Sequence, residues 1–472
     1  MSGITSFGAY IPYYRLAHKE IARAWGARAG DGVRAVANID EDSVTMAVEA
    51  VRDLLAGGDG RQIDALVFAT TTSPFGEKQA STVIATAADL RQDIRVADYA
   101  GSLRSATTAL RSAIDSVDAG AASNIIVAAA DQRPAAPKSQ NERVFGDAAA
   151  AIAVGRDRVI ARLVASHSII DEITDVWRGH DDQFVSGWEE RFSVTQGYTR
   201  VVKQVAQELF ERSAVGPSEI SKAIFYAPDA GALASAAKSI GLKAEQVPDH
   251  LFASVGNTGA AMPALVLSSV LERARPGEKL LVVGYGGGAD ALLFEVTQEI
   301  EADRRAPLRG VSGHLSNRQE LDSYERYARF RDLIEAEAAR RQTPSASAPQ
   351  TLRRRDEIYK LHGYRCLSCG KVQYPRQRVC IGCQTRDSFE SVRLADKRAR
   401  VFTYTVDFLN ADPDPPTVMT VVDFDGGGRA YLMMTDRNPA EVGIDQEVEM
   451  TFRKLYEAEG FTNYYWKCRP VR

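Results

Sequence analysis

The chain has 472 residues, of which 45% are hydrophobic, 25% charged and 8% aromatic, the composition of a globular protein with large cores. A chain of this length predicts two to four domains. The formal net charge of −4 excludes a global basic field that would draw the chain to nucleic acid or to an anionic membrane. No apolar run approaches the ~20 residues of a membrane-spanning helix, and the opening residues lack the pattern of a signal peptide. We therefore expect a cytoplasmic protein that neither spans a membrane nor binds nucleic acid.

The first three hundred residues contain a weak internal repeat. One copy spans residues 66–154 and the other 224–296, with corresponding segments offset by roughly 155 residues. Each copy predicts a strand, a small-residue turn that opens a helix, a second strand, and a glycine-rich turn into a third. Continuous apolar runs such as 123–130 are typical of strands covered on both faces, which indicates a layered α/β fold. Two such halves would bring two helix N-termini together, where free backbone N–H groups can bind an oxyanion or a phosphate.

Between residues 300 and 350 the sequence pattern changes. Apolar residues recur every third position amid Arg and Glu, which predicts an amphipathic helix packed on the core. The stretch 342–350 has no core-forming residues and predicts an extended linker. The residues of the apolar stripe are Leu321, Tyr324, Tyr327, Phe330 and Leu333.

The cysteines indicate a metal site. Cys366 and Cys369 form one CxxC pair and Cys380 and Cys383 another, with ten residues between the pairs. Two such knuckles close a tetrahedral four-sulfur site, for which zinc is the default metal and iron would also fit. Four cysteines leave no open coordination position, so we predict a structural role. The fifth cysteine, Cys468, is expected to be buried in a late strand.

After the cysteine pairs come five β-rich segments separated by glycine or proline turns, which predict a small five-stranded barrel. The chain is therefore expected to divide into an N-terminal half of the repeat (1–160), a C-terminal half (161–300), a helical segment and linker (301–350), a zinc ribbon (351–390) and a barrel (391–472).

Several motifs carry a resemblance to a known family. The runs Ile4-Thr-Ser-Phe-Gly-Ala-Tyr-Ile-Pro, Asn38-Ile-Asp-Glu-Asp-Ser-Val-Thr-Met-Ala, Phe145-Gly-Asp-Ala-Ala-Ala-Ala and Gly256-Asn-Thr-Gly resemble 3-hydroxy-3-methylglutaryl-CoA synthases of the thiolase superfamily. The likeness covers about residues 1–335. From about 351 the chain resembles the acyl-CoA-associated OB-fold family with a rubredoxin-like zinc ribbon. The resemblance implies a duplicated, layered αβαβα thiolase fold, a coenzyme A thioester as substrate, and a homodimer or larger complex, with a separate thiolase as a further partner.

The resemblance also implies positions for the catalytic residues. The position of the family's cysteine nucleophile falls on Leu103, that of its general acid/base glutamate on Thr71, and that of its histidine on Tyr226, whereas its asparagine is retained as Asn257. A leucine cannot form a thioester, and acetyl transfer onto the enzyme needs a nucleophile.

We therefore expect C–C bond chemistry without a cysteine nucleophile, of aldol or retro-aldol type on a 3-hydroxyacyl-CoA. Cysteine-free thiolase-like aldolases with OB-fold partners are a precedent that the resemblance supplies. In this hypothesis Tyr226 is the acid or base, and Arg104 is the candidate that would lower its pKa from the usual ~10 if it reaches inward. Arg104 and His180 are also the residues expected to bind the coenzyme A thioester. Asn257 and backbone N–H groups near Leu103 and Gly288 are the oxyanion donors. The alternative for Tyr226 is a core tyrosine with a satisfied hydroxyl.

Two histidines are further candidates. His180 lies in a stretch that resembles a substrate-covering segment of the family, and His250 precedes the Asn257 turn, although a surface or loop position is the simpler expectation for both. Family positions with an expected structural role are Asp131, Arg133, Glu142 and Asp147. Two other functions remain open: an inactive CoA-binding scaffold that recruits an active thiolase, and a genuine HMG-CoA synthase-type acyltransferase.

Overall fold

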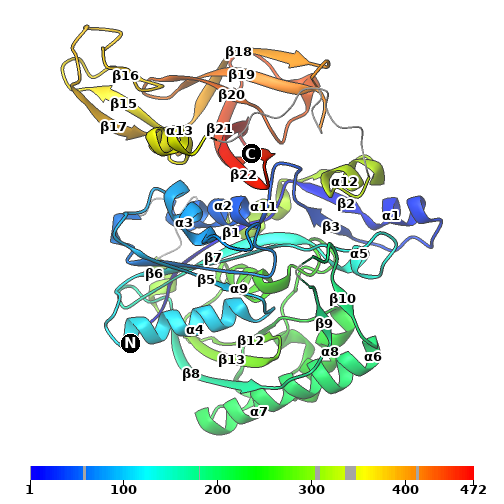
Figure 1. Ribbon diagram of the computed structural model, residues 1–472. Helices are drawn as coiled ribbons and strands as arrows, with labels where there is room; N and C mark the ends of the chain where they lie inside the picture. The colour runs from blue at the N-terminus through cyan, green and yellow to red at the C-terminus, as the bar shows by residue number, and fades with distance from the viewer. Residues whose placement is uncertain (1, 57–59, 180, 303–308, 335–346, 411–413) are drawn as a thin grey trace. The chain divides into compact units, whose positions relative to one another are not determined.

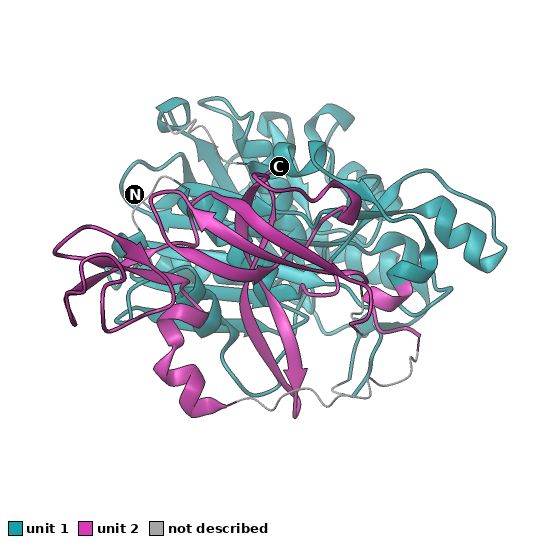
Figure 2. Ribbon diagram, turned by 90° about the horizontal axis from the view of Figure 1, so that it is seen from above, with its two compact units in different colours: residues 1–37, 42–327 teal, residues 38–41, 328–472 magenta. Residues whose placement is uncertain are grey.

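The computed structural model describes residues 2–56, 60–179, 181–302, 309–334, 347–410 and 414–472. The chain forms two compact units, one of residues 1–37 and 42–327 and the other of residues 38–41 and 328–472 (Figure 2). The finer domain boundaries expected from the sequence stay predictions. The boundary expected at residue 160 falls between two strands that are consecutive in the chain. None of the described helices is long and apolar enough to cross a membrane.

The first unit is built on a nine-stranded mixed sheet. Its two halves meet where β1 (Gly3–Tyr10) pairs with β8 (Ala161–Ile170) through only two residue pairs. The sheet order is β11-β12-β13-β8-β1-β7-β6-β4-β5. The other strands of this sheet are β4 (Ala65–Thr70), β5 (Arg95–Ala100), β6 (Ile125–Gln132), β7 (Asp147–Gly155), β11 (Lys222–Phe225), β12 (Lys279–Tyr285) and β13 (Gly288–Val296).

Helices complete five layers, as the resemblance implies. Helices α4 (Ser105–Asp118) and α9 (Met262–Leu271) contact each other and strands of both half-sheets, so they form the central layer (Figure 1). Helix α2 (Ser43–Leu55) covers β1, β6 and β7 from one side, and α7 (Arg200–Ser213) covers β8, β12 and β13 from the other. The αβαβα architecture is thereby confirmed. Smaller elements of this unit are β2 (Tyr14–Ala17), α1 (His18–Trp25), β3 (Val33–Val36), α3 (Ala80–Ala87), α5 (Asn141–Val144), β9 (Val176–Trp177), β10 (Ser186–Gly187), α6 (Glu190–Phe192), a π-helical turn η2 (Ser193–Thr199), α8 (Ala230–Ser239), α10 (Glu299–Ala302), α11 (Gly310–Ser316) and β14 (Gln319–Glu320).

Local sequence explains why these elements form. Every residue of β7 is buried, which fits its continuous apolar run and a strand covered on both faces. Helix α2 begins with a capping box: the Asp42 carboxylate accepts the Thr45 N–H at 2.8 Å, and the Thr45 hydroxyl oxygen accepts the Asp42 N–H at 2.8 Å. These local signals agree with the global layers.

The helical segment around residue 325 is partly as predicted. Helix α12 (Tyr324–Phe330) is shorter than the predicted stripe and carries its three middle residues, Tyr324, Tyr327 and Phe330, which are buried as predicted. Leu321 is buried before the helix begins, and Leu333 is half-buried after it ends. The expected extended linker is wrong at its end, because residues 348–350 begin helix α13 (Ala348–Arg353), where the Ser347 hydroxyl accepts the Gln350 N–H. Residues 335–346, which hold the rest of the predicted linker, lie outside the described residues.

The second unit contains two small sheets. The ribbon sheet has the order β16-β15-β17, and the barrel sheet the order β20-β19-β18-β21-β22. A parallel bridge between Met434 and Cys468 links the two ends of the barrel sheet, and Cys468 is fully buried, as predicted. The elements are α14 (Arg355–Ile358), β15 (His362–Cys366), β16 (Val372–Gln373), β17 (Phe389–Arg393), β18 (Ala399–Asp407), β19 (Thr417–Phe424), β20 (Arg429–Met433), β21 (Glu447–Ala458) and β22 (Phe461–Pro470). The five predicted strands are confirmed.

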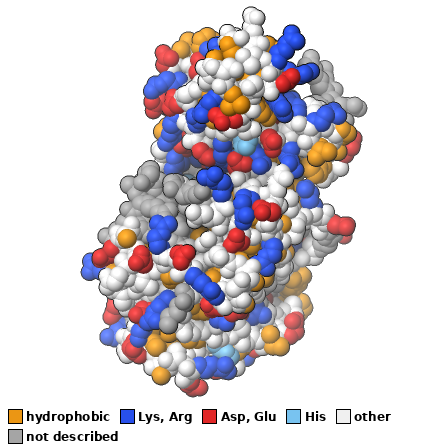
Figure 3. Space-filling model, turned by 90° about the vertical axis from the view of Figure 1, so that its left-hand side faces the viewer, with side chains coloured by type: hydrophobic (Ala, Val, Ile, Leu, Met, Phe, Trp, Pro, Cys, Tyr) orange, Lys and Arg blue, Asp and Glu red, His pale blue; other side chains and the backbone are white. Residues whose placement is uncertain are grey.

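On the face drawn in Figure 3, basic and acidic side chains are interspersed. This mixed pattern fits the small net charge of the chain, because no single sign of charge dominates that face.

A buried ionic cluster lies inside the second unit. The guanidinium of Arg453 has no exposed surface and contacts Asp40 at 3.0 Å, Glu41 at 2.9 Å and Asp436 at 2.6 Å. Lys467 Nζ lies 2.9 Å from the second oxygen of Asp40. Neighbouring cations, Arg453 foremost, hold the pKa of Asp436 well below its usual range. The short segment 38–41 is thus fixed to the barrel by charge pairs rather than by apolar packing.

Replacing Arg453 with leucine is expected to lower the free energy of unfolding of the second unit by about 3–5 kcal/mol, since three buried carboxylates lose a shared cation. Urea unfolding followed by circular dichroism measures the change. Arg429→Leu is the matched control, because Arg429 pairs with Asp423 at the surface and its loss should leave the midpoint almost unchanged. Equal midpoints for the two variants would show that the cluster contributes no stability.

Candidate functional site

Two adjoining cavities lie in the first unit where loops after the strands converge. The larger has a volume of about 830 Å³ and is lined by the loop after β4, the loop between β5 and α4, and residues 175–179. The smaller, about 290 Å³, is lined by α5, the π-helical turn η2, and residues after β11. Arg133, Asp175 and Val176 line both cavities and mark their junction.

Leu103 lines the larger cavity at the entrance to α4. Its side chain is 7% exposed, and within the described residues its backbone N–H has no hydrogen-bond partner. The neighbouring Ser102 hydroxyl donates to the Gly286 carbonyl at 3.1 Å and accepts the Arg104 N–H at 3.3 Å. The junction of helix and glycine-rich turn predicted from the repeat therefore forms. No cysteine occurs in residues 1–365, so the junction holds no sulfur nucleophile from its own unit.

Thr71 lines the same cavity, but its groups serve a loop-holding network. Its N–H donates to one oxygen of the buried Asp131 carboxylate at 2.7 Å and its hydroxyl to the other at 2.9 Å. Asp131 also accepts from the Thr70 hydroxyl and the Ala260 N–H, which confirms its expected structural role. Arg133 does more than hold a loop, since it reaches the cavity junction and stacks on Phe145 at 4.2 Å.

Tyr226 and Asn257 line the smaller cavity. Tyr226 is 4% exposed, and burial raises the pKa of its hydroxyl, against the opposing effects of Arg133 and a hydrogen bond with Asn257. Tyr226 is therefore a protonated phenol at neutral pH. The side-chain amide nitrogen of Asn257 donates to backbone, to the Ala227 carbonyl at 3.1 Å and the Pro228 carbonyl at 3.0 Å. It thereby fixes the loop that carries Tyr226.

Two other candidates near the junction are engaged in local packing. Arg104 lines the larger cavity, but its guanidinium donates to the Ile169 carbonyl at 2.9 Å and lies 3.6 Å from Asp290. The expectation that Arg104 lowers the pKa of Tyr226 is wrong, because that pKa is raised and the arginine that opposes the rise is Arg133. Gly288 begins β13 with φ +112°, and a Cβ there would lie 2.2 Å from the Ile169 carbonyl oxygen.

The two histidines are the remaining candidate site residues from the sequence. His180 lies outside the described residues. His250 is 3% exposed rather than at the surface, and it lines neither of the two cavities. Its Nε2 accepts the Phe225 N–H at 2.9 Å and its Nδ1 lies 2.8 Å from the Pro248 carbonyl, so Nδ1 carries the proton. Burial lowers its pKa to about 4.

This histidine gives the first unit an acid-sensitive position. Because the folded pKa is about 4 and the unfolded value 6.5, unfolded chains bind more protons between these pH values, so stability falls as the pH drops through this window. The loss due to His250 approaches about 3 kcal/mol at pH 4. Unfolding by urea at pH 7.5 and pH 4.5 should show a smaller acid loss in His250→Gln than in the wild type. An equal acid loss in both proteins would contradict the assignment.

Three polar residues of the cavities were missed from the sequence. Tyr285 donates its hydroxyl to Asp175 at 2.7 Å, and burial with the nearby carboxylate raises the pKa of this phenol. Tyr198 packs edge-on against Tyr285 with ring centroids 5.3 Å apart. Tyr285 lies within the run Gly284-Tyr-Gly-Gly-Gly, so the sequence alone could have placed it beside the glycine-rich turn. Asp175 and Tyr198 lie in no sequence motif that could have identified them.

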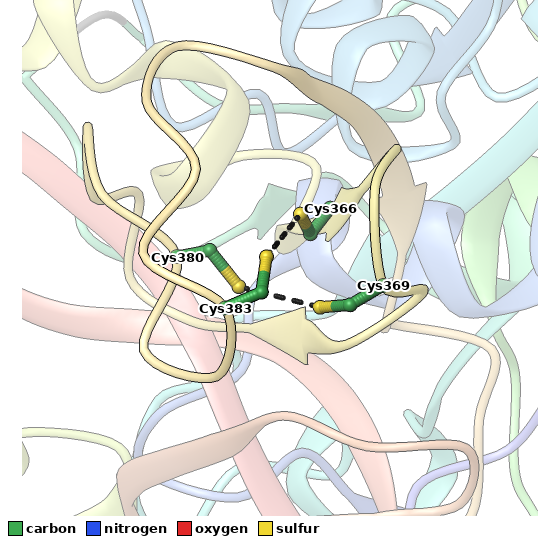
Figure 4. Close-up of side chains that lie close together, drawn as sticks. All are labelled: Cys366, Cys369, Cys380 and Cys383. Atoms are coloured by element: carbon green, nitrogen blue, oxygen red, sulfur yellow. Dashed lines mark hydrogen bonds between the residues drawn. The ribbon is translucent and has the colours of Figure 1, made fainter.

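The four predicted metal ligands converge in the second unit. Their sulfur atoms all lie within 4.8 Å of one another, and the Cys366–Cys383 and Cys369–Cys380 sulfur pairs are each 3.6 Å apart (Figure 4). A tetrahedral zinc with Zn–S bonds of about 2.3 Å places sulfurs about 3.8 Å apart, so the donor set fits the ion. With four thiolates, zinc would hold β15 and the two knuckles together and leave no position for a substrate.

Comparisons with known proteins agree with both units. Residues 210–295 match the family model for the C-terminal part of 3-oxoacyl-[acyl-carrier-protein] synthase III. Residues 357–390 match the rubredoxin-like zinc ribbon domain of ChsH2, and residues 391–453 its C-terminal OB-fold domain. The ribbon and the barrel predicted from spacing and strand pattern are therefore shown, and zinc is the metal that the ribbon family names.

Curated relatives match the first unit. Hydroxymethylglutaryl-CoA synthase of Pyrococcus furiosus is 31% identical over 336 residues, which cover 70% of this chain and 95% of the relative. The enzyme of the same name from Methanopyrus kandleri is 31% identical over 345 residues, covering 70% and 97%. Among solved structures, MvaS in complex with 3-hydroxy-3-methylglutaryl coenzyme A aligns with a TM-score of 0.62 and 19% identity, covering 73% of this chain and 94% of that one. That structural likeness shows a shared fold.

Proposed function

Because the chain belongs to the hydroxymethylglutaryl-CoA synthase family, we propose that it makes or breaks the C2–C3 bond of a 3-hydroxyacyl-CoA without forming an acyl-enzyme. The observation that carries the proposal is the lack of any cysteine in residues 1–365, with Leu103 at the entrance to α4. Acyl transfer onto the protein needs a nucleophile, whereas aldol chemistry between a thioester enolate and a carbonyl compound needs only proton transfer and charge stabilisation.

In the bond-forming direction, a base removes a proton from C2 of the acyl-CoA and the electron pair moves into the thioester as an enolate. Asp175 is the carboxylate proposed for this step, because it lies at the junction of both cavities. The enolate carbon attacks the carbonyl carbon of an aldehyde or ketone, the C2–C3 bond forms, and the carbonyl electron pair becomes an alkoxide. Tyr226, a phenol at neutral pH, gives its proton to that alkoxide. The retro-aldol direction reverses each transfer.

The enolate oxygen needs fixed donors. The Leu103 N–H is without a partner in the described part of the chain and precedes α4, whose N-terminal dipole favours negative charge. Asn257 supports the site in a different way from the oxyanion role expected from the sequence, since its amide nitrogen donates to two carbonyls of the Tyr226 loop. The two groups proposed to act on negative charge are therefore Tyr226, which protonates the alkoxide, and the Leu103 N–H, which donates to the enolate oxygen.

The proposal is tested by incubating the purified protein with a panel of acyl-CoAs and following the thioesters by mass spectrometry. The panel contains acetoacetyl-CoA with acetyl-CoA, HMG-CoA, and branched, aromatic and steroid-type 3-hydroxyacyl-CoAs. The expected result is cleavage of a 3-hydroxyacyl-CoA into a shorter acyl-CoA and a carbonyl compound, or the reverse condensation. Turnover of none of them, alone or with a thiolase added, would favour the inactive CoA-binding scaffold.

The second candidate is the HMG-CoA synthase reaction itself. The 31% identity to named synthases, over nearly their whole length, favours it more than it favours aldol cleavage. The same panel distinguishes the synthase reaction from aldol chemistry. Formation of HMG-CoA from acetoacetyl-CoA and acetyl-CoA would require an acyl-enzyme, and because residues 1–365 contain no cysteine, a different residue type of that segment would have to carry the acyl group.

The surroundings of this activity are proposed from the family resemblance. The chain acts in the cytoplasm on an acyl-CoA, as a homodimer or as part of a larger complex. A separate thiolase is a further proposed partner in that complex. The exposed edge strand β5, which ends the nine-stranded sheet beside the larger cavity, is the surface that supports such an association.

A further inference from the structure

Strand β18 of the barrel has an open edge along its second half. It pairs with β19 over its whole length, but with β21 only through its first two residues. The last backbone bonds on the β21 side belong to Val401, whose N–H donates to the Gln446 carbonyl at 3.0 Å and whose carbonyl accepts the Asp445 N–H at 2.8 Å. Over residues 402–407, the backbone groups that point away from β19 have no backbone partner in the described part of the chain. Such an edge is a template for pairing with another strand.

The sequence of this edge contains no residue that would prevent pairing. Residues 401–406 read Val-Phe-Thr-Tyr-Thr-Val, all β-branched or aromatic and none of them charged or a proline. A bulge at Phe402 bends the second half of the strand, which separates it from β21 and leaves its edge open. The two end strands of the same sheet are instead joined by the bridge between Met434 and Cys468.

Large apolar side chains are exposed at both ends of the open edge. Where β21 separates from β18, Phe402 is 51% exposed, and Ile444, in the turn bonded to β18, is 65% exposed. At the other end, directly after the strand, Phe408 is 74% exposed and Leu409 97%. Apolar groups gathered in this way along one strand mark a surface that contacts another protein.

The occupant that fits both ends is a second copy of the same strand. When two copies pair antiparallel about a two-fold axis at Thr405, Phe402 of one copy lies opposite Phe408 of the other. The same register brings Leu409 of one copy to the turn that holds Ile444 of the other. Each exposed apolar group at one end thus meets one from the opposite end. Aromatic pairs and Thr–Thr pairs of this kind stabilise neighbouring strands.

The charges of the segment fit the same register. Asp407 is the one charged residue in the sequence between positions 401 and 409. Asp407 of one copy lies opposite Thr403 of the other, beside the Phe402 ring on which the Arg429 guanidinium stacks at 3.7 Å. Unlike charges therefore approach each other at the rim of the contact. Rim pairs of this kind contribute to specificity more than to stability.

From these observations we propose that the barrels of two chains associate through β18 and form one continuous antiparallel sheet. The inference does not rest on the proposed function, since the contact would persist in a chain without activity. It differs from an association at β5, because it uses the second unit. A chain with both contacts has two self-complementary surfaces, as in a tetramer of dihedral symmetry.

Engineered cysteines in the full chain test the two-fold axis. Opposite residues of an antiparallel pair have Cα atoms about 4.5–5.5 Å apart, within reach of a disulfide, whereas residues offset by four positions are too far apart. Thr405→Cys should therefore form a covalent dimer on a non-reducing gel after oxidation by glutathione disulfide. Thr403→Cys, equally exposed on the same strand, should not exceed the wild-type background from native cysteines. Equal cross-linking in the two variants would overturn the proposed pairing.

A charge variant tests the association itself. Phe408→Lys combined with Leu409→Lys places positive charges at both ends of the contact, and both side chains are exposed, so the fold is preserved. Light scattering of this variant at micromolar concentration should give half the particle mass of the wild type, and the Thr405→Cys cross-link should disappear in this background. Leu352→Lys, 72% exposed in the same unit, is the control and should keep the wild-type mass. An unchanged mass in the double-lysine variant, or a wild-type mass that rises only when a thiolase is added, would refute the proposal.

Discussion

Replacing Cys380 with serine is expected to abolish zinc binding and unfold the ribbon of the second unit. Structural zinc in small domains contributes apparent binding free energies of about 10–16 kcal/mol, and the three-stranded ribbon sheet has little core of its own to replace it. Metal analysis should find one zinc per wild-type chain and close to none in Cys380→Ser. Limited proteolysis should then cut within residues 357–393.

The fifth cysteine provides the matched control for this prediction. Cys468 lies in β22, away from the four clustered sulfurs, and its thiol is buried next to the Thr420 hydroxyl at 3.2 Å. Cys468→Ser should keep a full zinc load. A full load in Cys380→Ser as well, or iron in place of zinc in the wild type, would contradict the structural zinc site.

Replacing Tyr226 with phenylalanine is expected to lower kcat by about 10²–10⁴, the usual contribution of a positioned acid or base, with little change in KM. The reason is that the phenylalanine ring keeps the packing of a side chain that is 4% exposed but removes the proton donated to the alkoxide. Steady-state kinetics on the thioester turned over in the panel provide the measurement. Tyr13→Phe serves as the control, and a Tyr226→Phe rate within threefold of the wild type would contradict the assigned role.

The raised pKa of Tyr226 also gives a pH dependence. Since burial keeps the phenol protonated above its usual ~10, the bond-forming rate should not fall from loss of this proton as the pH rises from 7 to 10. A tyrosine activated by a lowered pKa, as the sequence first suggested, would instead lose its proton within that range.

Much of the architecture was predictable because its signals are local. The two CxxC pairs and the alternating barrel strands each depend on short spacings. The repeat indicates two halves because two segments of the sequence resemble each other. The limits lie where distant segments decide the outcome. Arg104 lies 3.6 Å from Asp290, which is 186 residues away, and the Nε2 of His250 accepts the N–H of Phe225, a residue of strand β11, so neither side chain could be placed from its neighbours in sequence. Segment 38–41 joins the barrel unit through Arg453 for the same reason.

The candidate site shows the same division. The resemblance located Leu103, Thr71, Tyr226 and Asn257 on the walls of the two cavities, because family positions carry tertiary information that a single pattern does not. It could not indicate which groups are already hydrogen-bonded. The bonds of Asn257 to the Tyr226 loop, and the unpaired hydroxyl of Tyr198, become visible only when side chains are placed.

The central claim is that C–C bond chemistry proceeds here without a covalent acyl-enzyme. Intact-protein mass spectrometry of the full chain, quenched with acid during turnover of acyl-CoA, tests it most directly. We predict that the protein keeps the mass of the unmodified chain at every time point while the thioesters change. A mass increase of one acyl group that maps to a peptide within residues 1–365 would contradict the claim and return the chain to the acyl-transfer chemistry named for its relatives.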